Sequence, residues 1–125
     1  MIVLIEKNNV SLENNFYNLQ CPKIDISHYK HVSLENCYIE FDDSVRRNTL
    51  IDFCFGLIDK SVGNPNQIIG SEFLEKSSKF FWYNFSSASN QYKIQCQTLE
   101  ESLLQIRLSN PLEKIKKIRV ALKFE

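Results

Sequence analysis

Glycine and proline are scarce in this chain, with three of each among 125 residues. A collagen-like repeat or a Pro/Gly-rich disordered segment needs far more of both, so those classes are excluded. The hydrophobic share of 43% and the charged share of 24% are typical of a globular domain. Because no low-complexity tract and no internal repeat interrupts the sequence, we interpret residues 1–125 as a single domain.

The chain also lacks a net charge, because 15 basic side chains balance 15 acidic ones. It therefore has no overall attraction for nucleic acid or an anionic membrane, and any such contact must be local. The longest apolar run near the N-terminus, residues 1–5, is shorter than the ~7 residues of the shortest signal-peptide core or the ~20 of a spanning helix. We therefore expect neither secretion nor membrane insertion.

Closely spaced cysteine pairs are absent as well. The four cysteines lie 16, 17 and 42 residues apart, at Cys21, Cys37, Cys54 and Cys96. Without a secretion signal, we predict reduced, buried thiols that pack as small apolar side chains, although the even count leaves disulfides open. His28 and His31 lie between the first two cysteines, but this pattern lacks the short paired spacing of a structural zinc site. We predict two surface histidines and no metal or cofactor.

Catalytic frames are equally hard to find. No serine stands in a G-x-S-x-G context, and no glycine-rich loop has the form that binds phosphate. The acid pairs Asp42-Asp43 and Glu100-Glu101 fall in expected turns, where carboxylates are usually solvated. We predict that the protein is not an enzyme. A small metal-dependent enzyme centred on the two histidines ranks last among the alternatives.

What the sequence does contain is alternation of apolar and polar residues, which predicts strands. The clearest case is 118–124, where every second residue is apolar. Further strands are expected over 2–5, 16–21, 32–41, 50–58, 80–85, 92–96 and 104–108. The 32–41 segment changes phase near Glu35-Asn36, which indicates a β-bulge or a corner between two strands. About eight strands predict an all-β fold, an antiparallel two-sheet β-sandwich.

Two local features qualify this pattern. Thr98 and Glu101 resemble a capping box, and Leu99, Leu103 and Ile106 recur at helical spacing, so a helix is the alternative there. The aromatic segment 80–85, followed by a Ser- and Asn-rich turn over 86–90, predicts a hairpin with 92–96.

The aromatic segment is the first candidate surface. In a strand, Phe80 and Trp82 lie on the face opposite Phe81, Tyr83 and Phe85, so about half of the rings must be core. We expect core or subunit contact here, with Trp82 and Tyr83 as candidate interface residues. Stacking of bases or sugars is the alternative.

The second candidate surface is a group of basic residues near the C-terminus. Arg119 and Lys123 share the outer face of the last predicted strand, with Ala121 between them. We expect an ordinary charged strand surface and name both residues as candidates for an interface. Local contact with a nucleic-acid backbone is the alternative.

Four segments follow one another in an informative order: PKIDISHYKHVSLENCYIEF (22–41), LIDFCFGLIDKSVGNPNQIIG (50–70), NQYKIQCQTLEESLLQIRLSN (90–110) and IKKIRVALKFE (115–125). This order resembles the single jelly-roll minor capsid, or penton, proteins of Polinton/Maverick-type elements and related viruses. The matching positions are core and turn residues, and none is a catalytic motif.

The resemblance implies a jelly-roll fold and a non-enzymatic structural protein of the virion, made in the host cytoplasm or nucleus. It also implies closed rings of identical copies, conventionally pentamers, that contact other capsid proteins. Such a ring needs two different complementary patches on each subunit. A viral receptor-binding or lectin-like β-sandwich is the alternative, with binding loops at 62–66 or 86–90.

Overall fold

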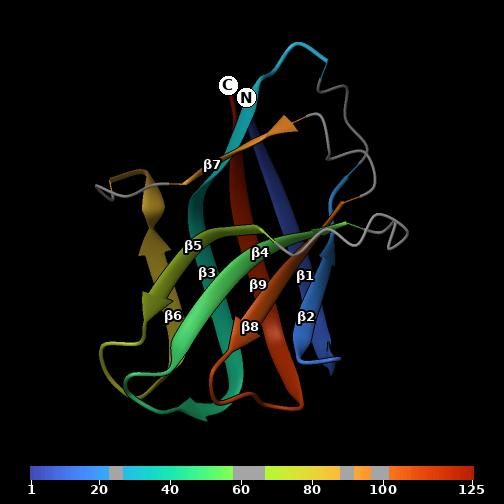
Figure 1. The fold of residues 1–125 in the computed structure, drawn as a ribbon. Coiled ribbons are helices and arrows are strands. Elements are labelled where there is room, and N and C mark those ends of the chain that lie inside the picture. The colour runs from blue at the N-terminus through green and yellow to red at the C-terminus, as the bar shows by residue number, and fades with distance from the viewer. Residues whose placement is uncertain (23–26, 58–66, 88–91, 97–101) are drawn as a thin grey trace.

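The computed structural model describes residues 1–22, 27–57, 67–87, 92–96 and 102–125. Within these residues the chain forms nine strands and one short 3-10 helix (Figure 1). The elements are β1 (Ile2–Glu13), β2 (Phe16–Gln20), β3 (His31–Val45), β4 (Leu50–Leu57), β5 (Gln67–Phe73), β6 (Ser78–Asn84), η2 (Phe85–Ser87), β7 (Lys93–Gln95), β8 (Ser102–Leu108) and β9 (Lys114–Phe124). The predicted all-β class is confirmed.

All strand pairs between the described residues are antiparallel, and they form one continuous hydrogen-bonded path. The strand order is β5-β4-β8-β2-β1-β9-β3-β6, with β7 also paired to β3. Strand β1 joins the two halves, because residues 2–11 pair with β9 while Leu12 and Glu13 pair with β2. The sheet curls, so that its two halves face each other (Figure 1).

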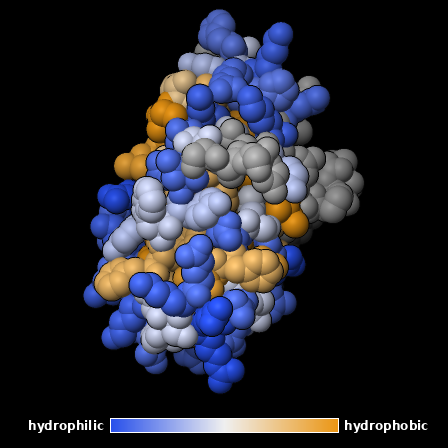
Figure 2. Space-filling view, turned by 90° about the vertical axis from the view of Figure 1, so that its left-hand side faces the viewer, coloured by the Kyte–Doolittle hydropathy of each residue, from blue (hydrophilic) through white to orange (hydrophobic). Residues whose placement is uncertain are grey.

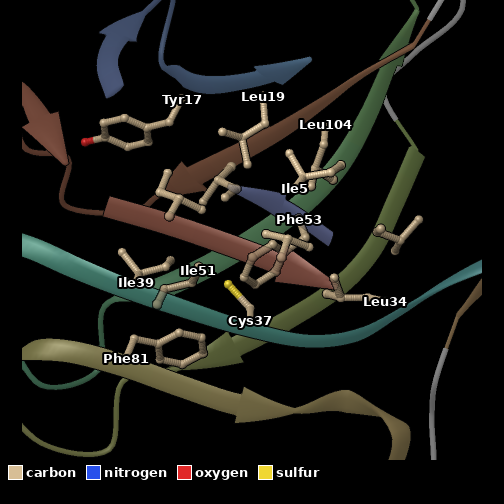
Figure 3. Packing of buried hydrophobic residues seen from close by; sticks show 14 of the residues in the cluster. Ile5, Tyr17, Leu19, Leu34, Cys37, Ile39, Ile51, Phe53, Phe81 and Leu104 are labelled. Carbon is tan, nitrogen blue, oxygen red and sulfur yellow. The ribbon is translucent and has the colours of Figure 1, made fainter. Parts of the chain in front are cut away.

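The core fills the space inside this curl (Figure 3). Tyr17 and Phe53 enter it from one half of the sheet, and Leu34 and Ile39 from the other; all four are 0% exposed. Burying a side chain of this size contributes about 1.5–3 kcal/mol, so this shared interior is the main source of stability. The Tyr17 hydroxyl donates to the carbonyl of Leu112, which satisfies its polar end.

The predicted irregularity in the third strand is confirmed as a β-bulge. Leu34 pairs with Leu122 and Asn36 pairs with Ala121, so Glu35 is an extra residue opposite β9. Because of this extra residue, the side chain of Cys37 lies on the same buried face as that of Leu34. The alternative of two strands meeting at a corner is wrong, because β3 continues through this point.

Tight turns depend on asparagine. Asn14 and Asn15, with φ of 50° and 72°, form the two-residue loop between β1 and β2. Two consecutive positive φ values define the hairpin turn whose twist fits antiparallel strands, and asparagine tolerates this conformation better than most residues. Asn48, with φ of 68°, occupies the turn between β3 and β4.

One prediction about strand pairing is wrong, whereas the strand predicted over 104–108 is confirmed as part of β8. The 80–85 and 92–96 segments do not form a hairpin in the described residues, because β6 and β7 both pair with β3, along residues 36–45 and 31–33 respectively. A β3 strand of 15 residues is long enough to hold both on one edge. The helical alternative fails over 102–108, which is β8, while residues 97–101 lie outside the described part.

Candidate functional site

The aromatic strand β6 has one buried and one exposed face, as predicted. Phe81 is 5% exposed, whereas Phe80 is 52% exposed and Trp82, the only tryptophan, is 64% exposed. Strand alternation explains the difference, because β6 lies over the core with only every second ring. The exposed pair requires a functional or interfacial explanation, since large apolar residues gathered on a surface often mark contact sites.

A groove lies beside β6, at the side where the two ends of the strand order face each other. Both β5 and β6 are terminal in that order, so within the described residues each has one edge without a partner strand. The groove encloses about 240 Å³ between them. Its lining is mainly aromatic on the β6 side and carries charged residues in β5 and just after it: Phe80, Trp82, Tyr83, Phe73, Glu72, Glu75 and Lys76. Phe73 is itself 55% exposed.

Tyr83 closes the inner end of this groove. Its ring lies parallel to Phe81, with centroids 6.4 Å apart, and meets Phe85 edge-on at 4.7 Å. Its hydroxyl donates to the Glu72 carboxylate, and this hydrogen bond to a negative group raises the pKa of Tyr83. The residue therefore ties β6 to β5 and is half-buried, unlike Trp82 on the same strand.

Trp82 and Arg119, two of the predicted interface residues, share the outer face of the sheet. Tyr38 on β3 pairs with Trp82 on one side and with Arg119 on the other, so the three form one row across three strands. The Arg119 guanidinium lies 5.5 Å from the centroid of the Tyr38 ring, which is a cation–π contact. The Tyr38 ring is also 6.4 Å from that of Phe80.

The lysines of β9 lie close to acids. Lys116 lies 3.4 Å from Glu40 and Lys117 lies 3.2 Å from Glu6. Lys123, a predicted interface residue, lies 3.1 Å from Glu125, which also contacts Lys93 at 2.7 Å. The first two contacts cross between neighbouring strands, whereas Glu125 joins two lysines at the end of the sheet. Whether this surface contacts a nucleic-acid backbone stays a prediction.

A second exposed apolar surface lies on β1. Ile2 is 54% exposed and Leu4 is 58% exposed, and both point to the outer face of the sheet. Leu4 is opposite the small Ala121 on β9, while Ile2 is opposite Lys123. We call these two residues the β1 ridge. Alternation could not identify them, because all of residues 1–5 are apolar and the run has no polar phase.

The outer face of the other half carries a polar network. The Asp52 carboxylate accepts hydrogen bonds from the Ser71 hydroxyl at 2.6 Å and from Arg107 Nη2 at 2.8 Å. Arg107 also lies over the Phe16 ring, 5.8 Å from its centroid. Its pKa is raised mainly by the hydrogen bond to Asp52. This network links β4, β5 and β8 side by side, and we assign it a structural role.

The residues of the weak zinc pattern are not brought together. His28 and His31 are exposed, whereas Cys37 is 0% exposed in the core. Burial raises the pKa of the Cys37 thiol well above its usual value, and that of Cys21 to about 11. In the described ranges no three potential ligands among His, Cys, Asp and Glu gather at one point. All four cysteines are free, and all except the half-buried Cys21 are buried.

Of the two acid pairs considered as catalytic candidates, the structure describes only Asp42-Asp43. Asp42 lies 3.8 Å from Lys114, and Asp43 accepts a hydrogen bond from the backbone N–H of Ser44 at 2.8 Å; both acids are exposed. Glu100 and Glu101 lie outside the described residues, as do the expected binding loop 62–66 and most of 86–90.

Comparison with known proteins gives no family. No protein-family model matches the chain, and a search of curated proteins finds no match. No helix among the described residues has both the length and the apolarity needed to cross a bilayer. The strand order and the exposed surfaces are therefore the features from which a function can be inferred.

Proposed function

We propose that this protein is a structural protein of jelly-roll type that assembles with identical copies into a closed ring, as penton-like capsid proteins do. The order in which its strands pair is the observation that carries this proposal. The proposed fold is a two-layer sandwich, in which β1, β9, β3 and β6 form one layer and β2, β8, β4 and β5 form the other.

The pairing has the form of one long hairpin folded over on itself. If the short β7 is set aside, the described residues form eight main strands. The first pairs with the last, the second with the seventh, the third with the sixth and the fourth with the fifth. The eighth then pairs with the third, and the seventh with the fourth. This wrapping is how two Greek keys combine in a jelly roll, a fold found in capsid and lectin domains.

A fold alone does not define a function, so assembly needs a second argument. A closed ring requires two different surfaces on each copy that fit each other. Exposed apolar side chains of the described residues include two separate groups, those of the groove beside β6 and those of the β1 ridge. This distribution supports a structural role that depends on the shape of the interface.

The test is the mass of the purified protein in solution. We expect a discrete multimer by light scattering or native mass spectrometry, and ring-shaped particles by electron microscopy, with five copies as the expected number. A protein that stays monomeric at the highest soluble concentration, with no rings on the grid, would contradict the proposal.

The second candidate is a receptor-binding or lectin-like module. The row of Tyr38, Trp82 and Arg119 on the outer face favours it, since exposed aromatic rings beside a charged group suit a sugar surface. Glycan-array or cell-surface binding by a monomeric protein, lost in the Trp82→Ser variant, would support this candidate over the first.

A further inference from the structure

We infer that neighbouring copies meet through unlike surfaces, with the β1 ridge of one copy seated in the groove beside β6 of the next. The inference rests on the proposed self-assembly and specifies its interface. The occupant of the groove is therefore a second copy of this chain, and the residues that enter it are Ile2 and Leu4.

The spacing of side chains on the two surfaces agrees. Ile2 and Leu4 are two positions apart on β1, and Phe80 and Trp82 are two positions apart on β6. In both strands alternate side chains are therefore about 6.6–6.8 Å apart on one face. Two aliphatic side chains from a neighbouring copy can thus meet two aromatic rings in register.

The groove has room for this contact. Its 240 Å³ equals the liquid volume of about eight water molecules, which is enough for two aliphatic side chains. The four residues that would meet are each more than half exposed in the isolated chain. Covering them together would remove apolar surface from water on both partners, which is the main driving force for association.

Charge also fits this orientation. Glu72 and Glu75 line the groove together with one lysine, Lys76, so the charged part of its lining has a small excess of negative charge. Beside the ridge, Lys123 is opposite Ile2 and Lys93 reaches the same Glu125. Lys93 and Lys123 share the single acid Glu125, and Glu6, two positions beyond Leu4, is paired with Lys117, so the surroundings of the ridge carry a small excess of positive charge. A contact between two copies of the groove would instead bring like charges together.

Heterologous contact of this kind has a geometric consequence. Each copy offers one groove and one ridge, and the exposed rings of the groove lie with the ridge on the outer face of the layer formed by β1, β9, β3 and β6. If a copy uses them with two different neighbours, copies add until a ring closes, whereas reciprocal use with a single neighbour stops at a two-fold dimer. The proposed ring therefore requires that the groove and the ridge of each copy contact different neighbours.

Cysteine cross-linking tests the contact directly. Leu4→Cys and Trp82→Cys are made separately in a Cys21→Ser background, because Cys21 is the one native thiol that is not buried. We expect the two variants, when mixed, to form disulfide-linked dimers, while each variant alone does not. The double variant should give a ladder of cross-linked species that ends at the ring size. Ser44→Cys, exposed at the far end of β3, is the control for random collision.

The possible outcomes separate the inference from the proposal on which it rests. Efficient cross-linking of Trp82→Cys with itself would overturn the inference in favour of groove–groove contact. A multimer by mass whose mixed variants cross-link no better than the Ser44→Cys control would overturn the inference and leave self-assembly standing. A monomer by mass overturns both.

A non-covalent measurement supplies a second readout. Leu4→Ser and Trp82→Ser should each raise the dissociation constant of the assembly about tenfold or more, as expected for central interface residues. Both residues are exposed, so the far-ultraviolet dichroism of the variants should match that of the wild type. Unchanged assembly in both variants contradicts the inference.

Discussion

Glu125 shows how individual side chains stabilise the end of the sheet. Its carboxylate contacts Lys93 at 2.7 Å and Lys123 at 3.1 Å, and these two cations lower its pKa from 4.5 to about 2, the hydrogen bond to Lys93 being the largest cause. The contact joins β9 to β7 through charge, where β3 lies between them in the sheet.

The lowered pKa predicts a dependence of stability on pH. A carboxyl group with a depressed pKa in the folded state stabilises fully above its unfolded value of 4.5, and this contribution is lost as pH falls through about 2. Glu125→Gln should therefore lower the melting temperature slightly at neutral pH, with the difference vanishing near pH 2 and in high salt. Thermal melts monitored by circular dichroism, with the exposed Glu113→Gln as control, measure this difference. A difference that is constant over the whole range would show that charge is not responsible.

At the scale of elements, close packing between the two halves depends on Gly70 in β5. A Cβ atom at this position would lie 2.9 Å from Leu34 Cδ2 and 3.0 Å from Phe85 Cε1, both closer than ordinary carbon contacts. Leu34 belongs to β3, in the opposite half of the curled sheet. The absence of a side chain in β5 therefore allows the two halves to approach.

Gly70→Ala tests this packing. We expect the variant to lose about 1–3 kcal/mol of unfolding free energy, since neighbouring core side chains must move. The double variant Gly70→Ala/Leu34→Ala should lose less unfolding free energy than the sum of the losses in the two single variants. The reason is that truncating Leu34 makes room for the added methyl group. Urea unfolding measures both, and Lys79→Ala on exposed β6 is the control. Wild-type stability in Gly70→Ala would mean that the halves adjust freely.

Alternation identified several strands because one side of each faces the core. The segments near β8 and β9 were predictable on this basis, and the phase change at Glu35 located the bulge. The segment near β4 was predictable from its continuous apolar run, and the one near β6 from the strand preference of its aromatic residues. β5 was missed because Ile68 and Ile69 adjoin Gly70 without a polar alternate, and a register shift occurs opposite Phe53 and Cys54. The residue types at Asn14-Asn15 are those that favour a tight turn. No local sequence feature indicates which strands pair with each other.

The candidate site was only partly predictable for the same reason. Alternation correctly separated Trp82 from Phe81 on opposite faces of β6, but it did not say which of the two faces would be exposed. The groove was not predictable, because it depends on Phe73 and Glu72 of β5 lying next to β6, which is a consequence of curling. The pairing of β6 and β7 with one strand is also a tertiary property that the local sequence does not specify.

For the whole molecule, the pairing is dominated by contacts between distant parts of the chain. Ile2 pairs with Lys123, and β1 as a whole lies next to β9. Loop closure must precede such contacts, so proteins of this kind fold more slowly than helical ones.

We accordingly expect refolding in about milliseconds to seconds after dilution from urea. Far-ultraviolet dichroism in a stopped-flow instrument is the suitable probe, because Trp82 is 64% exposed and its fluorescence should change little on folding. Complete refolding within about 100 μs would contradict the dominance of distant pairings.

The neighbouring ends of the chain have a mechanical consequence. The Phe124 N–H donates to the Met1 carbonyl at 2.8 Å, so the first and last residues lie side by side at one end of the molecule (Figure 1). Figure 2 views the side of the molecule that carries β5 and β6, where apolar patches lie among hydrophilic residues. A pulling force applied to both termini would load the hydrogen bonds between β1 and β9 one after another, as in a zipper. In the optical trap an isolated copy should therefore open at low force, beginning at its ends.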